Sequence, residues 1–217
     1  MFDHSLRGLK DAIFNPLSRS VPPSITPKQI TFLAFISGLV SCIFAAFQIT
    51  IPSLFFWALN RFLDCLDGAV ARHQRTQSDV GGFLDLLGDF VVYALIPISC
   101  ALGNNYGDTA DAEGLTVAVL EATFWINNFV LFYCAAVAEK WRANGAVMES
   151  GELTSVVMRP ALVEGFESAV FFTLMLMFPG YLMLLSWVMC VGVMIGIVQR
   201  VSWILSAMGM KEQRKKH

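Results

Sequence analysis

The chain has 217 residues, of which 56% are hydrophobic and only 15% charged, and its mean hydropathy is +0.61. A water-soluble domain would carry about a quarter charged residues, so this composition excludes that class and indicates a polytopic membrane protein. The formal net charge of −2 says little by itself, and no nucleic-acid partner is expected.

The first expected element is an amphipathic helix. Residues 1–20 mix apolar side chains such as Phe14 and Leu17 with basic ones such as Arg19. This pattern is typical of a helix that lies on a membrane surface, so residues 1–25 are predicted to form an interfacial segment. Two acidic residues, Asp3 and Asp11, argue against a mitochondrial targeting peptide.

Apolar segments that approach the roughly 20 residues needed to cross a bilayer follow in series. The predicted spans cover about 30–49, 52–71, 83–103, 115–138, 161–178 and 182–205. Pro179-Gly180 ends the short fifth span and predicts a tight turn into the sixth. Because no long linker or repeat interrupts the series, residues 1–217 are predicted to form one all-α domain with six transmembrane helices.

The basic residues are distributed on one side of this arrangement. All fifteen Lys and Arg residues fall in the termini, the even-numbered loops or the adjoining helix ends. The loops near 50, 104–114 and 179–181 contain none. The positive-inside rule therefore predicts an integral membrane protein with both termini on the cytoplasmic side, and it does not identify the membrane.

Small residues within the spans predict close packing. The five cysteines have neither metal-site nor disulfide spacing and are expected to be core residues: Cys42, Cys65, Cys100, Cys134 and Cys190. Gly192 and Gly196 in the sixth span allow close helix packing, either within one chain or across a homodimer.

Four acidic residues interrupt the apolar pattern around the second connection: Asp64, Asp67, Asp85 and Asp89. Each carboxylate in a bilayer costs roughly 2.5–3.5 kcal/mol on insertion scales, so a compensating partner is required. Divalent cations such as Mg²⁺, Mn²⁺ or Ca²⁺ prefer such oxygen ligands. At helical spacing the first pair shares a face with Gly68 and the second pair with Gly81, which leaves room for a ligand. Helix capping explains one or two of these aspartates, but not four in register.

The full motif reads Asp64-x2-Asp67-Gly68-x2-Ala71-Arg72-x8-Gly81-x3-Asp85-x3-Asp89. It resembles the signature of the CDP-alcohol phosphatidyltransferases, DxxDGxxARx8GxxxDxxxD, at every position. That family also has a core of six transmembrane helices. The resemblance implies an enzyme of phospholipid biosynthesis, a transferase of substituted phosphate groups. Such an enzyme moves a phosphatidyl group from CDP-diacylglycerol to a polar alcohol and releases CMP.

The resemblance also implies residue roles. Asp64, Asp67 and Asp85 would be the main ligands of Mg²⁺ or Mn²⁺, with two ions per site. Asp89 would contribute to the second ion and act as general base on the acceptor hydroxyl. Gly68, Arg72 and Ser78 would contact the cytidine diphosphate, and Gly81 should keep the facing helix close. The structural alternatives are packing glycines, a helix cap at Ser78 and a snorkelling Arg72.

A weaker match precedes the first span. Thr26-Pro27-Lys28-Gln29-Ile30-Thr31 resembles a TPNxxT-like segment that the family often carries close to the nucleotide, although Lys28 stands where Asn is usual. Pro27 and Thr31 are therefore secondary candidates. A helix start with Thr26 as N-cap and Pro27 at the first position explains these residues equally well.

The acceptor pocket must come from other residues on the cytoplasmic side. The candidates are Arg159, Glu164, Glu167 and Arg200. The two arginines would bind a phosphorylated acceptor, or they would only neutralise the two glutamates. Serine, glycerol 3-phosphate, inositol and inositol phosphate all remain open as acceptors. Glu121, Asn127 and Asn128 are expected to be interhelical hydrogen-bond partners.

Two other functions compete with this interpretation. The first is the other branch of the family, in which CDP-choline or CDP-ethanolamine donates to diacylglycerol; those proteins are usually much longer. The second is a divalent metal transporter that uses the aspartates as its transport site. A cation path does not need a basic residue such as Arg72, and the small residues suit a bulky ligand better than an ion.

Overall fold

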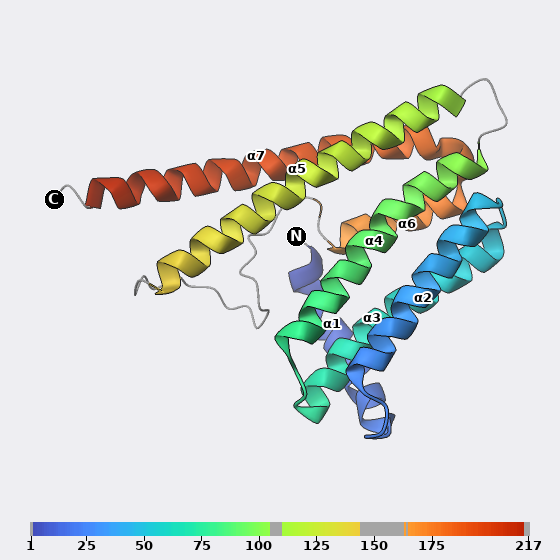
Figure 1. Ribbon diagram of the computed structural model, residues 1–217, viewed down its shortest axis with the longest axis horizontal. Helices are drawn as coiled ribbons and strands as arrows, with labels where there is room; N and C mark the ends of the chain where they lie inside the picture. The colour runs from blue at the N-terminus through green and yellow to red at the C-terminus, as the bar shows by residue number, and fades with distance from the viewer. Residues whose placement is uncertain (1, 105–109, 144–162, 164, 215–217) are drawn as a thin grey trace.

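The computed structural model describes residues 2–104, 110–143, 163 and 165–214, which form helices and no strand (Figure 1). The elements are α1 (Phe2–Ser20), α2 (Pro27–Ala46), α3 (Thr50–Gln74), α4 (Asp79–Gly103), α5 (Ala110–Ala143), α6 (Gly165–Met177), the short 3₁₀ helix η1 (Pro179–Tyr181) and α7 (Leu182–Arg214). The predicted all-α class is confirmed for this part of the chain.

Two groups of helices make up the molecule. Helices α3 and α4 each pack along α2, and we call the three helices the motif bundle because α3 and α4 carry the aspartates. Helices α5 and α7 lie side by side as a long pair, and α6 contacts both groups (Figure 1). Helix α1 packs on α3. In Figure 1 the two groups approach each other near the end of α4 and diverge toward the C-terminal ends of α5 and α7.

Local sequence signals define the ends of the helices in the motif bundle. Helix α2 starts with a capping box between Thr26 and Gln29, with Pro27 at the first turn. Helix α3 ends at Arg75, which adopts a left-handed conformation with φ of 56°. The Ser78 side chain then caps α4 by accepting a hydrogen bond from the Gly81 backbone. Residues 75–78 therefore form a short connection between α3 and α4, and both helices pack on α2. We call α3, α4 and this connection the α3–α4 hairpin.

Four of the described helical segments are long and apolar enough to cross a membrane: Pro27–Ala46, Asp79–Gly103, Asp111–Trp141 and Pro179–Gly209. Helix α6 is apolar but has only 13 residues. Helix α3 is long enough, but Arg61 and the motif residues interrupt its apolar run. The chain is thus a multi-helix membrane protein, whereas the predicted count of six spans is not confirmed. The expected start of the fifth span, at 161, 162 and 164, lies outside the described residues.

A missing side chain allows the close approach of α2 to its neighbours. A Cβ atom on Gly38 would lie 2.5 Å from Val92 Cγ2 and 3.1 Å from Asn60 Nδ2. Val92 is fully buried on α4, and Asn60 is buried on α3. Gly38 therefore lies where all three helices of the motif bundle meet.

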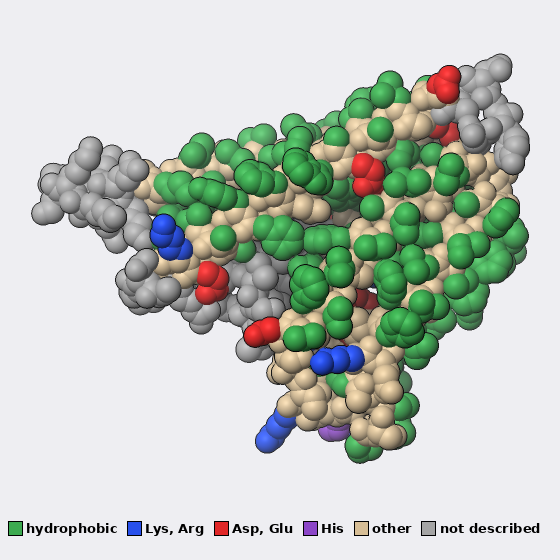
Figure 2. All heavy atoms as spheres, in the orientation of Figure 1, with side chains coloured by type: hydrophobic (Ala, Val, Ile, Leu, Met, Phe, Trp, Pro, Cys, Tyr) green, Lys and Arg blue, Asp and Glu red, His purple; other side chains and the backbone are tan. Residues whose placement is uncertain are grey.

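The predictions for the small residues are largely confirmed. Four cysteines are buried and Cys65 is partly buried, and all five are free. Gly192 packs within the chain, since a Cβ atom there would lie 2.7 Å from Val163 Cγ2. The turn after the fifth predicted span is η1, as Pro179-Gly180 indicated. Hydrophobic side chains cover most of the face in Figure 2, as expected of a surface against lipid.

Candidate active site

The α3–α4 hairpin brings the four motif aspartates together. Helix α3 supplies Asp64 and Asp67, and helix α4 supplies Asp85 and Asp89. The carboxyl groups of Asp64 and Asp85 are close enough to share a hydrogen bond. Asp67 is only 5% exposed, while the other three are partly buried. The sequence periodicity had predicted these two carboxylate faces, and the fold turns them toward each other.

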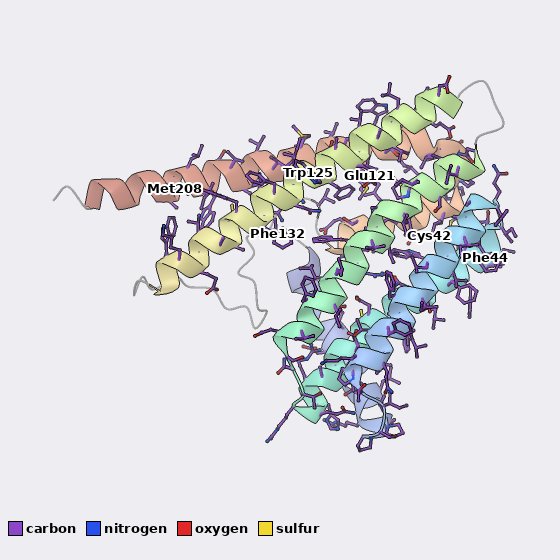
Figure 3. The ribbon with its side chains drawn as sticks, in the orientation of Figure 1. Cys42, Phe44, Glu121, Trp125, Phe132 and Met208 are labelled. Atoms are coloured by element: carbon purple, nitrogen blue, oxygen red, sulfur yellow. The ribbon has the colours of Figure 1, made fainter. Side chains whose placement is uncertain are left out.

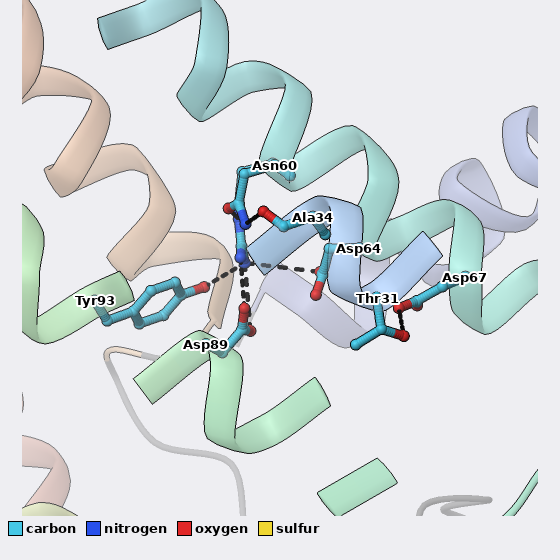
Figure 4. Close-up of polar contacts among 8 residues, drawn as sticks. Thr31, Ala34, Asn60, Asp64, Asp67, Asp89 and Tyr93 are labelled. Carbon is cyan, nitrogen blue, oxygen red and sulfur yellow. Dashed lines mark hydrogen bonds and ion pairs between the residues drawn. The ribbon is translucent and has the colours of Figure 1, made fainter. Parts of the chain in front are cut away.

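A fifth charged residue, Arg61, contacts Asp64 and Asp89, whose positions are labelled in Figure 4. Its Nη2 donates to Asp89 Oδ1 at 2.5 Å, and its Nη1 lies 3.4 Å from Asp89 Oδ2. The same Nη1 is 3.7 Å from Asp64 Oδ2. Arg61 lies outside the family motif, and the sequence assigned it no role. The signal that could have found it is its position three residues before Asp64, on the same helix face.

Aromatic and polar groups enclose the Arg61 guanidinium. Its Cζ lies 4.9 Å from the ring centroid of Trp57 and 5.0 Å from that of Tyr93. Arg61 Nη1 also donates to Tyr93 Oη at 2.8 Å, and Nε donates to Asn60 Oδ1 at 2.7 Å. A planar group that stacks on aromatic faces while it donates through a fixed fork of N–H groups is specific to arginine, because the lysine ammonium is a compact charge on a flexible stem.

Asp67 has a separate partner on α2. The hydroxyl of Thr31 is 2.5 Å from Asp67 Oδ2 and 3.1 Å from the Pro27 carbonyl. Thr31, a secondary candidate from the sequence, is thereby placed in direct contact with a motif aspartate. Pro27 and Thr26 have the structural role of a helix start.

The residues predicted to contact the cytidine diphosphate lie near the ends of α3 and α4. If residue 68 carried a Cβ atom, the only described side chain within 4 Å of it would be that of Arg72, with Nη1 at 3.4 Å. This face of the helix is therefore open. Arg72 is exposed and pairs with Asp11 of α1 at 3.3 Å. Ser78 is the N-cap of α4. The prediction that Gly81 keeps the facing helix close is wrong, because a Cβ there would meet only Ser78 Oγ within 4 Å.

The predicted acceptor residues are only partly described. Arg159 and Glu164 lie outside the described residues. Glu167 lies in the first turn of α6. Arg200 is 5% exposed on α7 and donates to Asn127 Oδ1 of α5 at 2.6 Å. Asn127 is therefore an interhelical partner as predicted, and the acceptor pocket stays a prediction.

An apolar groove of about 560 Å³ lies elsewhere, on the α5–α7 pair. Its walls include Trp187, Val191, Met194 and Val198, with Thr123 and Gln199 as the polar members. It contains no charged side chain and no motif residue. The groove therefore offers a surface for apolar chains and no group that could carry phosphoryl chemistry.

The donor set of the aspartate site fits a divalent cation in its chemistry. Arg61 pairs with Asp64 and Asp89, so among the motif residues four carboxylates are balanced by one guanidinium and the site has an excess of negative charge. Two carboxyl groups as close as Asp64 and Asp85 need a proton or a cation between them. Among the described residues, no three Asp, Glu, His or Cys side chains are close enough to hold one ion, so no coordination geometry is derived.

Comparisons with known proteins match most of the chain, including the segment that carries the four aspartates. The family model for CDP-alcohol phosphatidyltransferase matches residues 24–198. The inner membrane protein YnjF of Escherichia coli is 30% identical over 166 residues, which cover 73% of each chain. Phosphatidylinositol phosphate synthase of Mycolicibacterium smegmatis is 31% identical over 69% of this chain and 63% of its own length. Archaetidylinositol phosphate synthase of Pyrococcus horikoshii is 39% identical over 79 residues, 36% of this chain and 42% of its own length.

Proposed function

The chain belongs to the CDP-alcohol phosphatidyltransferase family, and from this membership we propose a specific reaction at the aspartate site. The chain is a transferase of substituted phosphate groups in phospholipid biosynthesis. In the proposed reaction CDP-diacylglycerol gives its phosphatidyl group to a polar alcohol, and CMP is released. The observation that supports this proposal most directly is that α3 and α4 bring the carboxyl groups of Asp64 and Asp85 within hydrogen-bonding distance.

The donor would lie along the open face of α3. Gly68 leaves space beside the helix, and Arg72 next to it carries the positive charge that a diphosphate requires. Ser78 lies across the connection at the start of α4, in reach of the same end of the site. Arg72 pairs with Asp11 through an exposed contact, and such contacts are weak enough to exchange for a phosphate.

The family is generally dependent on divalent metal, and we propose that Asp64, Asp67 and Asp85 hold Mg²⁺ or Mn²⁺, two ions per site, with Asp89 as a further ligand of the second ion. Bound cations would neutralise the diphosphate oxygens and stabilise the leaving CMP. Thr31 holds Asp67 through its hydroxyl and so orients one proposed ligand. Ligand orientation by an outer hydrogen bond is a common feature of metal sites.

Asp89 is the proposed general base. The acceptor oxygen forms a bond to the phosphorus that carries diacylglycerol, while the bond from that phosphorus to the CMP oxygen breaks. The acceptor proton passes to the Asp89 carboxylate, and the bonding electron pair leaves with CMP. This transfer requires Asp89 to approach the acceptor hydroxyl to about 2.6–3.2 Å.

Among the possible acceptors, we rank inositol phosphate first. Two relatives are named phosphatidylinositol phosphate synthase and archaetidylinositol phosphate synthase. A phosphorylated acceptor also suits the arginines Arg159 and Arg200, which the sequence places on the same side as the motif. Glu164 and Glu167 would then hydrogen-bond polyol hydroxyls, and serine, glycerol 3-phosphate and inositol are the alternatives.

The orientation in the membrane is part of the proposal. We propose that α2 to α7 all span the membrane, with residues 1–25 at the interface and both termini on the cytoplasmic side, as one domain. A reporter fused to either terminus should then be cytoplasmic, and one inserted at 104–114 should lie on the opposite side. Termini on opposite sides would refute this arrangement. A homodimer is also proposed, and the mass of the purified protein in detergent tests it.

The reaction is tested with purified protein in mixed micelles. CDP-diacylglycerol and Mg²⁺ are supplied with inositol 1-phosphate, glycerol 3-phosphate, inositol or serine in turn, and CMP release is measured. We expect CMP with one of them, inositol 1-phosphate first, and its loss in excess chelator. Full transfer in chelator would refute the metal role.

The two competing functions predict other outcomes, in CMP release and in metal uptake. CMP release from CDP-choline with diacylglycerol, but not from CDP-diacylglycerol, would support the other branch of the family. Uptake of Mn²⁺ into proteoliposomes without any CMP release would support a transporter.

A further inference from the structure

We propose that Arg61 is a positioning residue for phosphatidyl transfer: it holds one oxygen of Asp89 and leaves the other to accept the proton of the acceptor hydroxyl. The inference rests on the proposed function, since it requires Asp89 as the general base. It assigns to Arg61 a role that the family motif does not include.

The two oxygens of Asp89 are held unequally. Asp89 Oδ1 receives the strong contact from Arg61 Nη2 at 2.5 Å, whereas Oδ2 lies 3.4 Å from Nη1. A contact of 3.4 Å is at the weak end for an N–H···O bond. Oδ2 is therefore the less engaged oxygen: one of its two lone pairs can serve the proposed second ion and the other can accept from the acceptor hydroxyl. The fork of the guanidinium fixes the plane in which Oδ2 lies.

The guanidinium itself has little freedom to move. Trp57 and Tyr93 rings lie near it, and Asn60 and Tyr93 take hydrogen bonds from it. These partners are anchored in turn: Trp57 Nε1 donates to Thr173 Oγ1 of α6 at 2.8 Å, and Asn60 Nδ2 donates to the Ala34 carbonyl of α2 at 2.8 Å. Every helix of the motif bundle, together with α6, thus contributes to the position of Arg61.

The location of Arg61 also separates two carboxylates with different proposed tasks. Its Nη1 lies between Asp89 and Asp64, 3.7 Å from the latter. Without that positive charge, the Asp89 carboxylate would be repelled by Asp64 and would lack a fixed orientation. A simple counter-charge would not need the fork or the aromatic contacts, so lysine should replace it fully if Arg61 only neutralises charge.

The first test therefore compares Arg61→Lys and Arg61→Gln with the wild type. CMP release at saturating CDP-diacylglycerol, CDP binding by calorimetry, Mn²⁺ binding and thermal stability in detergent are measured on each variant. We expect Arg61→Lys to keep nucleotide and Mn²⁺ binding but to lose at least about 10-fold in kcat, because small misplacements of a catalytic group are costly. Arg75→Gln, an exposed charge removal at the end of the same helix, is the matched control.

A double-mutant comparison shows whether Arg61 acts through Asp89. If it does, adding Arg61→Gln to Asp89→Asn should change kcat by no more than about 2-fold relative to Asp89→Asn alone. Multiplicative losses would overturn the inference. The double variant should also be more stable than Arg61→Gln alone, because the latter leaves a carboxylate without its partner.

A milder variant keeps the inference testable if Arg61→Gln does not fold. Tyr93→Phe retains the ring but removes the hydroxyl that holds Arg61 Nη1. We expect kcat to fall roughly 2–10-fold, the range for one hydrogen bond, with CDP binding unchanged. Tyr133→Phe on α5, which is 50% exposed, is the control and should behave as wild type.

The outcomes separate this inference from the function on which it rests. Normal turnover in Asp89→Asn would refute Asp89 as base and with it the proposed function of that residue. Loss in Asp89→Asn together with wild-type kcat in Arg61→Lys would refute only the role of Arg61. A parallel loss of kcat, nucleotide binding and stability in Arg61→Lys would mean that Arg61 is structural, and would also overturn the inference.

Discussion

The motif bundle and the α5–α7 pair both carry polar groups in apolar helices, but they satisfy them differently. In the bundle, buried Asn60 donates to the Ala34 carbonyl, and buried Ser41 and Ser53 bond each other across α2 and α3. In the pair, two buried atoms have no hydrogen-bond partner among the described residues: Glu121 Oε1 and Ser186 Oγ. A polar site in a membrane thus becomes fixed only where neighbouring helices supply its partners.

The motif bundle and the α5–α7 pair also differ in how closely their helices pack. Gly38 lets α2 approach α3 and α4 closely, whereas α5 projects large side chains outward, including Trp125, which is 75% exposed. Trp125 and Phe132 are labelled on α5 in Figure 3, with Glu121 one turn before Trp125. Large exposed apolar side chains also occur on the bundle, such as Phe55 of α3 at 62%, so both regions present a surface to lipid and the difference between them lies in internal packing.

The largest expected effect is in the motif bundle and concerns the division of roles among its aspartates. Asp89→Asn should bind CDP-diacylglycerol nearly normally but lose at least about 100-fold in turnover, the low end for general-base catalysis. Asp64→Asn and Asp67→Asn should weaken donor binding itself, because they remove proposed metal ligands. Nucleotide binding and CMP release are measured on all three. Equal loss of binding in all three would remove the distinction between base and ligand.

The second-largest expected effect concerns the packing of α2 at Gly38. Gly38→Ala should lower the free energy of unfolding by about 1–3 kcal/mol, because its new methyl group overlaps Val92 in a closed contact. Gly114→Ala on α5 is the control, since no described atom lies within 4 Å of a Cβ there. Denaturation in detergent micelles compares the two. If both variants were equally stable, the two regions would not differ in packing.

The third prediction compares Glu121 of the α5–α7 pair with the aspartates of the motif bundle. Glu121→Met removes a partly buried acid whose Oε1 has no described partner, so stability should rise by about 1 kcal/mol or more. Turnover should stay unchanged, unlike that of any motif aspartate variant. Thermal unfolding and CMP release on one preparation test this; a loss of activity would place Glu121 in a functional site.

The smallest effect concerns the contact between α1 and the bundle. Asp11→Asn breaks an ion pair with Arg72 in which both side chains are nearly half exposed. Exposed pairs contribute about 0–1 kcal/mol, so stability should hardly change. Arg72→Gln should instead weaken CDP binding, which calorimetry on both variants can measure. Equal CDP affinities in these two variants would argue against Arg72 as a nucleotide ligand.

Features that depend on neighbouring residues could be predicted from the sequence. Thr26 and Pro27 start α2, Ser78 caps α4, and Pro179 begins a turn, because these signals act within one helical turn. The faces of the four aspartates followed from helical periodicity in the same way. The all-α class needed only the length and spacing of apolar runs.

Features that depend on distant neighbours could not be predicted. Arg61 acquires its position from Asp89 and Tyr93, 28 and 32 residues away, so the sequence near it looked like an ordinary basic helix end. The prediction for Gly81 was wrong because the sequence does not distinguish a glycine that packs beside a helix cap from one that packs against a neighbouring helix. The charges in α3 were recognised from the sequence, but the partner of Arg61 on α4 is supplied by another helix, which no local pattern reveals.

The short connection between α3 and α4 bears on how the protein enters the membrane. With only residues 75–78 between them, both helices leave the ribosome almost together, and the contact of Arg61 with Asp89 closes over only 28 residues. A hairpin inserted as one unit carries Arg61 in with Asp64 and Asp89, so part of its acidic charge is already compensated during translocation. This charged contact can therefore form before the synthesis of α5, α6 and α7, and α6 later adds the Thr173 contact that anchors Trp57.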